Sequence, residues 1–231
     1  MKKKKELREG EGIEAKVKNK SKNKELYLIL SVIAFSVGIF FASYFIFGSL
    51  NKFEYEGLTF TKEKFGDIPV FHHYYYFNAN GQLYKYNLFL RNDPRKNNVP
   101  ITGKAVDIEF SKYDTIYISL DPNNSLEGCK YAAVGISNLA SFLTDNQLYA
   151  KGASTDEEQA KLNNVEHVTC DNVGTFDIGI ILKSGDETRV IHGGRNCYVI
   201  EISNCEVLEA IEKFEVESVL DARERALREE V

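Results

Sequence analysis

The sequence predicts one N-terminal transmembrane helix followed by an α+β (or α/β) domain with a mixed sheet and two main helices, one of them C-terminal. Three observations predict this fold class. Residues 26–50 form an apolar stretch without a charged residue, residues 51–121 contain aromatic-rich runs separated by turns, and segments with helical periodicity alternate with later strand segments. A chain of 231 residues has room for one ordinary folded domain beside such a helix.

The apolar stretch LYLILSVIAFSVGIFFASYFIFGSL, residues 26–50, is long enough to cross a membrane. As a helix it would reach about 37 Å, which exceeds the hydrocarbon core of about 30 Å. The absence of charge in an otherwise polar chain disfavours a soluble core helix. A cleaved signal peptide usually has an apolar region of about 7 to 15 residues and an A-x-A cleavage site, and this stretch has neither feature. We therefore expect an uncleaved signal anchor.

Charged residues are distributed unevenly around this stretch. Residues 1–24 contain ten Lys and Arg against four Asp and Glu, whereas residues 51–231 contain 19 against 29. The positive-inside rule therefore places the basic tail, residues 1–25, in the cytoplasm and the acidic domain, residues 51–231, outside the membrane. A basic tail also suits nucleic acid, but beside a membrane span it is commonly an orientation signal with weak attraction to the inner leaflet. The acidic domain argues against nucleic acid as its ligand.

Small residues recur along one stripe of the predicted membrane helix. Ala34, Gly38 and Ala42 follow one another at a spacing of four. Small side chains at this spacing let two helices approach closely, although small residues are also common in membrane spans generally. The stripe predicts possible self-association of the chain.

The residues after the span are expected to form β-structure. Residues 71–77 and 82–90 suit a hairpin around Asn80-Gly81, because asparagine followed by glycine favours a two-residue turn. Further strands are predicted at 104–110 and at 115–121. Their order in a sheet cannot be read from the sequence.

Two main helices are expected in the domain. The first lies within residues 129–143, where apolar residues recur on one face, with Asn124 and Glu127 as a capping pair. Residues 151–164 are expected to be a surface connection, with a short helix begun by Thr155 and Glu158. Three strands follow within 176–203. A final helix begins near Glu206, and Val207, Ile211 and Phe214 form its apolar side. Basic residues lie near the end of this helix, where they suit its dipole: Arg223, Arg225 and Arg228.

All four cysteines fall in the domain predicted to lie outside the membrane, where disulfides are stable. A straight strand over 198–202 would separate Cys197 from Cys205 by about 20 Å. Disulfides need Cα atoms about 4.4 to 6.8 Å apart, so these two cysteines are not expected to pair with each other. Each then pairs with Cys129 or Cys170.

The position of the cysteines at helix starts favours one of the two remaining pairings. SNCE, residues 203–206, matches a capping box, which would put Cys205 in the first turn of the last helix, as Cys129 would begin the earlier one. If the strands that lead into both helices are parallel, the two helix starts share one edge of the sheet. We expect the disulfides Cys129–Cys205 and Cys170–Cys197.

A redox thiol at Cys205 is the alternative, since a helix N-terminus lowers the pKa of a thiol. No C-x-x-C motif accompanies Cys205, which disfavours this alternative. The spacing of the cysteines does not suit zinc binding.

Other residues with possible chemistry are each explained at least as well by a structural role. His72 and His73 would point to opposite faces of a strand and could not readily share a metal. His167 and His192 have no motif partners.

Arg95, Lys96 and Arg195 lie in turn-like segments that could hold an anion or could be solvated. Asn123 begins an N-x-S glycosylation site, and the neighbouring LDPNNSLE lacks the spacing of a calcium loop. Known catalytic and nucleotide-binding motifs are absent, so no catalytic, metal or cofactor residue is assigned.

The segments LRNDPRKNNVPITG, YISLDPNN and NCYVIEISNCEVLEAIEKF resemble uncharacterised archaeal proteins with one N-terminal span and an extracytoplasmic cysteine-bearing domain. The resemblance covers about residues 53–220. It implies an archaeal cell surface and structural cysteines, and it brings no catalytic residues.

The sequence therefore predicts a single-pass membrane protein whose outer domain binds a partner or assembles at the cell surface. The alternative is an extracytoplasmic enzyme, either a hydrolase or a thiol redox enzyme, whose site is assembled from loops and has no signature in sequence order. Convergent polar side chains in one deep pocket would favour the enzyme, and a shallow apolar or aromatic surface would favour binding.

Overall fold

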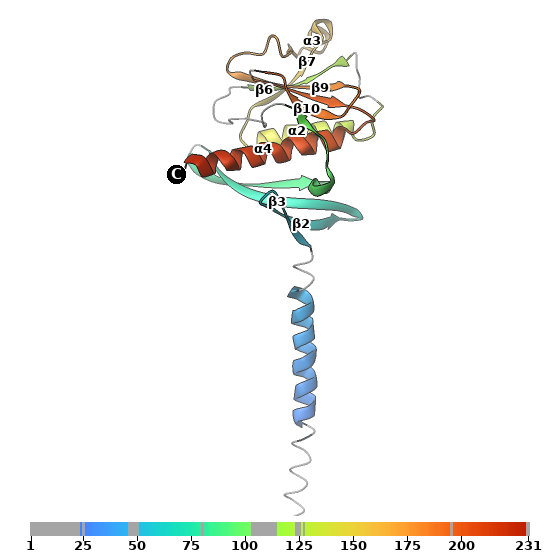
Figure 1. Ribbon diagram of the computed structural model, residues 1–231, viewed down its shortest axis with the longest axis vertical. Helices are drawn as coiled ribbons and strands as arrows, with labels where there is room; N and C mark the ends of the chain where they lie inside the picture. The colour runs from blue at the N-terminus through green and yellow to red at the C-terminus, as the bar shows by residue number, and fades with distance from the viewer. Residues whose placement is uncertain are drawn as a thin grey trace, which may run out of the picture. The chain divides into compact units, whose positions relative to one another are not determined.

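A computed structural model of the chain describes residues 24, 26–45, 51–79, 81–102, 115–122, 126, 128–194 and 196–229. The chain divides into two compact units, Met1–Lys52 and Phe53–Val231. The first contains one described helix and the second contains two sheets and the remaining helices (Figure 1). The predicted class, an apolar N-terminal helix followed by an α+β domain with a mixed sheet and a C-terminal helix, is confirmed.

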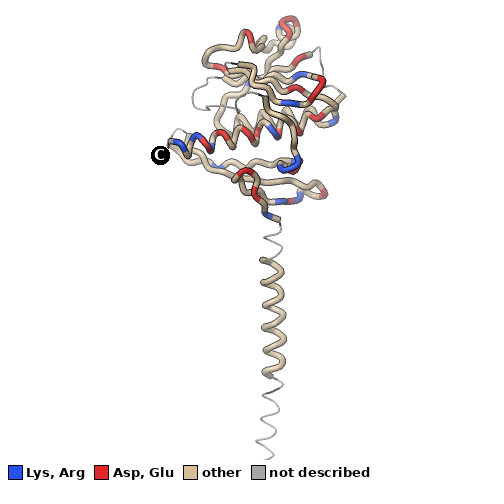
Figure 2. Tube along the Cα trace, viewed as in Figure 1, with Lys and Arg blue, Asp and Glu red and all other residues tan. Residues whose placement is uncertain are grey.

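The N-terminal helix runs over Leu26–Phe45 and carries no charged residue, as the uniformly tan helix in Figure 2 shows. Its 20 residues extend about 30 Å, which matches the hydrocarbon thickness of a bilayer. None of its described side chains is buried. By length and composition the helix can cross a membrane, and a signal sequence has the same properties. Residues 46–50 of the predicted span lie outside the described residues.

Sheet A consists of four strands in the order β1-β2-β3-β4, with bounds Lys52–Tyr55, Leu58–Phe65, Ile68–Ala79 and Gln82–Leu90. The strands β3 and β4 are antiparallel, with Ala79 opposite Gln82, so a two-residue turn joins them as predicted. Gly81 has a φ of +76°, a conformation that glycine adopts without steric cost. Because β4 ends the sheet, its far edge has no strand partner among the described residues.

Sheet B consists of seven strands in the order β5-β10-β11-β9-β6-β7-β8. Neighbouring strands are parallel except for the antiparallel pair β10 and β11. The central strands β6, β9 and β11 are rich in buried β-branched residues, which is typical of a sheet covered on both faces. The strand bounds are β5 Ile101–Thr102, β6 Thr115–Leu120, β7 Ala150–Ser154, β8 Glu166–His167, β9 Asp177–Ser184, β10 Arg189–His192 and β11 Cys197–Ile202.

The helices α2 (Ala132–Asp145) and α4 (Val207–Glu229) lie between the two sheets (Figure 1). They pack closely at Gly135, where an added Cβ would lie 3.1 Å from the side chain of Ile211. One hydrophobic core joins both sheets and both helices, and its fully buried members include Phe60, Leu88, Phe142, Ile180 and Phe214. The short elements η1 (Pro94–Lys96) and α3 (Glu157–Asn163) complete the domain.

Both main helices begin later than the sequence predicts. The helix α2 starts at Ala132 with Tyr131 as its N-cap, so Cys129 precedes it, and the expected capping residues Asn124 and Glu127 lie outside the described residues. The helix α4 starts at Val207, and no capping box forms around Cys205. Asn204 and Cys205 have φ values of 49° and 61°, which are left-handed and incompatible with a first helical turn.

Three further expectations differ from the structure or lie beyond it. Residues 151–164 are not only a surface connection, because β7 occupies their start and pairs in parallel with β6. The strand AKGAS has little apolar character, so its sequence gives no strand signal. The short helix α3 is capped by Asp156, whose carboxylate accepts a hydrogen bond from Gln159 N, rather than by Thr155. The strand predicted at 104–110 lies outside the described residues.

Candidate functional site

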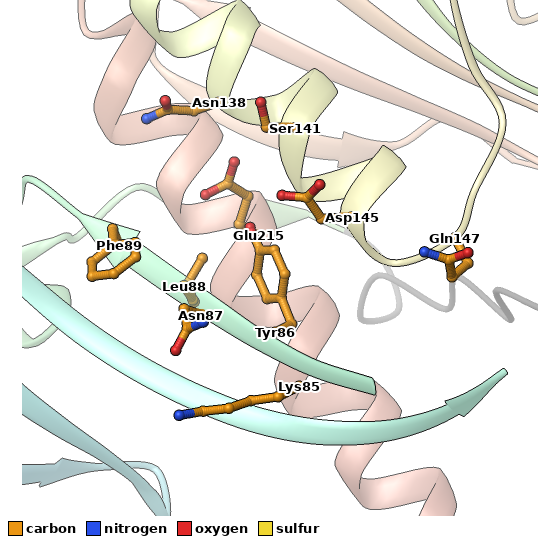
Figure 3. Close-up of a pocket in the computed structure, with 10 residues that line it drawn as sticks. All are labelled: Lys85, Tyr86, Asn87, Leu88, Phe89, Asn138, Ser141, Asp145, Gln147 and Glu215. Atoms are coloured by element: carbon orange, nitrogen blue, oxygen red, sulfur yellow. The ribbon is translucent and has the colours of Figure 1, made fainter. Parts of the chain in front are cut away.

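A polar cleft opens between the edge strand β4 and the helix α2. Its volume is about 450 Å³, and Glu215 of α4 lies at its back, between β4 and α2 (Figure 3). We call this feature the polar cleft; its lining residues are Lys85, Tyr86, Asn87, Leu88, Phe89, Asn138, Ser141, Asp145, Gln147 and Glu215.

The two walls of the polar cleft follow from the periodicity of their elements. On α2, Asn138, Ser141 and Asp145 recur at spacings of three and four, so they share one side of the helix. Leu139 and Phe142 occupy the neighbouring side and are buried in the core. The opposite wall is β4, which presents strand backbone as well as side chains. The cleft therefore combines polar side chains with the edge of a sheet.

Glu215 is the most unusual group in the polar cleft. It is only 2 % exposed, and its Oε1 atom has no hydrogen-bond partner among the described residues. Burial, reinforced by the nearby Glu212, raises the pKa of Glu215 well above its ordinary value. The shift favours the protonated carboxyl group, which can both donate and accept a hydrogen bond.

Glu212 lies one helical turn before Glu215, and it has a structural role. Its carboxylate accepts hydrogen bonds from Arg91 N at 2.5 Å, Asn92 N at 3.1 Å and Asn92 Nδ2 at 2.9 Å. Burial raises the pKa of Glu212 to about 7, although these three donors oppose the shift. The contacts fasten the end of β4 to α4 and so hold one wall of the polar cleft in place.

Two tyrosines hold the α2 wall against sheet A. The Tyr75 hydroxyl donates a 2.7 Å hydrogen bond to Asn146 Oδ1, and Asn146 Nδ2 donates to Phe142 O at 2.7 Å. The Tyr86 ring packs edge-on against Phe142, with ring centroids 5.8 Å apart. Burial raises the pKa of both tyrosines, so they stay neutral. The C-terminal end of α2 is thereby fixed against β3 and β4.

A second hollow, the apolar groove, has a volume of about 720 Å³ and lies between α2, α3 and the β6–β7 part of sheet B. Its lining includes Ile118, Leu120, Ile136, Val165 and Leu182. Asp121 and Lys151 are the charged residues in that lining. Among its described lining residues, the groove offers apolar contact but no buried polar atom without a partner, whereas the polar cleft has one in Glu215.

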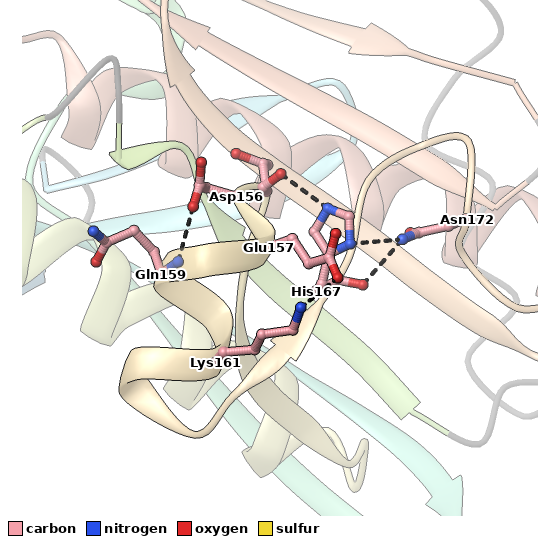
Figure 4. A network of polar contacts seen from close by, with 7 residues as sticks. Asp156, Glu157, Gln159, Lys161, His167 and Asn172 are labelled. Carbon is pink, nitrogen blue, oxygen red and sulfur yellow. Dashed lines mark hydrogen bonds and ion pairs between the residues drawn. The ribbon is translucent and has the colours of Figure 1, made fainter.

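A network of polar contacts surrounds His167 on β8 (Figure 4). The His167 Nε2 atom lies 3.1 Å from Thr155 O, and Asn172 Nδ2 donates to His167 O at 3.1 Å. Lys161 and Glu157 form an ion pair of 2.6 Å along α3. Backbone groups supply much of this network, and its members are exposed, so it stabilises the connection between β7 and β8. This arrangement agrees with a structural role for His167.

The two histidines of FHHYYYF point to opposite faces of β3, as predicted. His73 packs on the inner face beside Phe60, and its Nδ1–H donates to Thr59 O at 2.9 Å. Burial lowers the pKa of His73, which favours the neutral ring. His72 lies on the outer face, where its ring nitrogens contact Glu63 at 2.9 Å and Asn87 at 3.1 Å.

The remaining sequence candidates do not gather at one site. Arg95 pairs with Asp93 in its own turn, and its guanidinium lies 3.8 Å from the centre of the Phe53 ring on β1. His192 stacks on Tyr198. Asn123 and Arg195 lie outside the described residues. No three His, Cys, Asp or Glu side chains in the described part of the chain form a metal-binding group.

The cysteines form the disulfides Cys129–Cys205 and Cys170–Cys197, the two pairs expected from the sequence. Their Cα atoms are 5.1 and 5.3 Å apart. The strands β6 and β11 both run parallel to β9, so the segments that follow them meet at one edge of sheet B. Cys129 and Cys205 join those segments, and both disulfides therefore have structural roles.

Sequence reasoning missed Glu215, although a signal was present. Val207 and Ile211 define the apolar side of α4, and Glu215 continues the same spacing of four. A charged residue on the buried side of a helix indicates a satisfied or a functional carboxyl group. The facing residues of β4 and α2 are distant in sequence, so the cleft itself had no sequence signal.

Comparison of the chain with protein family models, with curated proteins and with solved structures finds no match. The functional interpretation therefore rests on the geometry of the chain itself.

Proposed function

We propose that the chain is a membrane-anchored extracytoplasmic binding module that holds an extended peptide segment of a partner in the polar cleft. The observation that carries the proposal is the buried Glu215, whose Oε1 atom has no partner, at the back of a cleft beside the edge strand β4. A buried polar atom without a partner costs free energy that a bound ligand can recover.

The edge of β4 determines the class of ligand. An edge strand presents unpaired backbone N–H and C=O groups, and an extended peptide can satisfy them by adding a strand. The nine residues of Gln82–Leu90 make β4 long enough for several such pairs. The polar side chains of Asn138 and Ser141 face the cleft from α2 and supply contacts to the side chains of the peptide. In its protonated form, which burial favours, the Glu215 carboxyl group is both donor and acceptor for a backbone amide.

The location of the module rests on two features. The helix Leu26–Phe45 is long and apolar enough to serve as an anchor, and the two disulfides suit an oxidising compartment. We propose the orientation with the basic tail in the cytoplasm, because of the excess of Lys and Arg before the helix. The resemblance to archaeal single-pass membrane proteins supports an archaeal cell surface. Self-association through Ala34, Gly38 and Ala42 stays a prediction.

The test uses the full chain in lipid nanodiscs and a displayed library of unstructured peptides. Selected peptides should protect the amides of residues 86–89 from hydrogen exchange. The Glu215→Leu variant should bind them about tenfold more weakly, because the cleft loses a donor and an acceptor. The Glu215→Gln variant should retain binding, since glutamine keeps both functions.

The matched control is Glu158→Leu, which makes the same substitution at an exposed position of α3, outside the lining of the polar cleft. It should leave peptide affinity unchanged. The proposal is wrong if the library gives no binder, if bound peptides protect a different surface, or if Glu215→Leu binds as tightly as the unchanged chain.

A second candidate function is an extracytoplasmic hydrolase with Glu215 as general acid. The raised pKa of Glu215 and the presence of Asp145 in the same lining favour it, because an acid catalyst must hold its proton near neutral pH. The two proposals differ at glutamine. Glu215→Gln should retain peptide binding but abolish acid catalysis. If the unchanged chain cleaves a bound peptide and Glu215→Gln binds that peptide without cleaving it, the enzyme is established.

A further inference from the structure

The outer face of sheet A is rich in exposed aromatic and aliphatic side chains. We call it the outer aromatic face; its exposed members are Phe65, Ile68, Tyr74, Tyr76, Leu83 and Phe89, with exposed fractions between 42 % and 68 %. The strand register places them on one side of the sheet, since Phe65 lies opposite Ile68 and His72 lies opposite Phe89. The other side of the sheet packs on the helices.

The side chains of the outer aromatic face contact one another instead of standing singly. The Phe89 ring stacks on His72 at 4.5 Å between centroids and meets Phe65 edge-on at 6.2 Å. Tyr74 meets Tyr76 at 6.0 Å, and Lys85 Nζ lies 4.3 Å from the centre of the Tyr74 ring. Single exposed apolar residues are ordinary, but a contiguous set on one sheet face marks an interaction surface.

The covalent chain limits how far this sheet can lie from the end of the apolar helix. Phe45 ends the helix and Lys52 begins β1, so seven Cα–Cα steps join them. A fully extended chain spans at most about 25 Å over that length. With the helix in a bilayer, β1 begins within that distance of the hydrocarbon boundary.

The charges of the domain also distinguish sheet A. Residues 51–91 contain five Lys and Arg and four Asp and Glu, whereas residues 92–231 contain 14 and 25. An anionic bilayer surface repels the acidic remainder and does not repel sheet A. Tyrosine and lysine near apolar side chains are also the residues that suit the headgroup region, because each has an apolar body and a polar tip.

We propose that the outer aromatic face docks on the headgroup region of the bilayer in which the chain's own helix is anchored. The occupant is lipid rather than a protein partner. Phe65, Leu83 and Phe89 enter the boundary of the acyl chains, while the Tyr74 and Tyr76 hydroxyls and the Lys85 ammonium stay among the headgroups. The tether provides a high effective concentration, so even weak affinity of the face for lipid keeps it docked.

The chain contains no tryptophan, so one introduced tryptophan reports its own surroundings without background. The variant Tyr76→Trp places the reporter on the outer aromatic face. The control Phe176→Trp places it at a residue before β9 that is similarly exposed, at 66 % against 58 % for Tyr76. Each full-length variant is reconstituted into vesicles of phosphatidylcholine and phosphatidylglycerol, with and without bromine on the acyl chains, which quenches fluorescence on contact.

Brominated lipid should quench the Tyr76→Trp variant at least about twofold more than the Phe176→Trp variant, and its emission should be blue-shifted. Recovery of both disulfides by non-reducing peptide mapping establishes that each variant is folded. Equal quenching of the two variants contradicts the proposal. A blue-shifted but unquenched Tyr76→Trp variant also contradicts it, because the face is then covered by protein, such as a second copy of the chain.

Discussion

Glu212 and Glu215 are both buried acids on α4, but their surroundings differ. Three N–H groups donate to Glu212, whereas Glu215 Oε1 has no partner among the described residues. Glu212 thus stabilises the domain, whereas the unpartnered buried atom of Glu215 costs free energy, which the proposed peptide ligand would recover. Groups that serve binding commonly lower the stability of a protein, and the proposed role of Glu215 fits this pattern.

Replacement of each acid by glutamine should therefore have different effects on the free energy of unfolding. Glu212→Gln puts an NH₂ group against donors and should cost about 1 to 3 kcal/mol. Burial already favours the protonated form of Glu215, so Glu215→Gln, which has a similar shape, should change stability by less than about 0.5 kcal/mol. Urea unfolding of the full chain in nanodiscs, followed by tyrosine circular dichroism, measures both. Equal changes in the free energy of unfolding for the two variants would contradict the described difference between the surroundings of Glu212 and Glu215.

The raised pKa of Glu212 also predicts a pH dependence of stability. Its pKa is about 7 in the folded chain against 4.5 as the ordinary value, so the folded state binds more protons between these values. The Glu212 contribution is therefore fully present below pH 4.5 and is lost as the pH rises through 7, by up to about 3 kcal/mol. The unchanged chain should lose more stability over this interval than Glu212→Gln. Parallel pH profiles would contradict the assignment.

At the scale of elements, the sequence predicted what local patterns determine. The hairpin at Gly81, the strands β6, β9, β10 and β11 and both main helices are confirmed because their periodicity and turn residues are strong. The strand β7 was missed because AKGAS becomes a strand only through pairing with β6. The start of α4 was misplaced because a left-handed Cys205, joined to Cys129, overrides a plausible capping box.

The two disulfides connect elements over different sequence separations, and this predicts a ranking of their effects. Cys129–Cys205 closes 76 residues and Cys170–Cys197 closes 27. In the chain-entropy view the longer loop constrains the unfolded chain more, by about 1 kcal/mol. Replacing Cys129 and Cys205 by serine should therefore destabilise the domain more than replacing Cys170 and Cys197. Denaturant unfolding without reductant gives both values, and the reverse order would mean that native contacts dominate.

At the scale of the whole molecule, the chain separates into a basic tail, an apolar helix and an acidic domain. Composition along the sequence predicts this organisation, and the α+β class of the domain was predicted from its strand and helix patterns. The polar cleft could not be predicted in the same way, since residue 89 and residue 138 meet only after sheet A packs on α2. The outer aromatic face was visible in FHHYYYF only as an aromatic strand, because its exposure depends on which side the helices cover.

The orientation of the chain in the membrane underlies the binding module, the disulfides and the docking surface. Protease treatment of intact cells, followed by mass spectrometry of the released peptides, tests it most directly. Residues 51–231 should be cleaved, while residues 1–25 stay protected until the membrane is permeabilised. Protection of the acidic domain together with cleavage of the basic tail would contradict the proposed orientation.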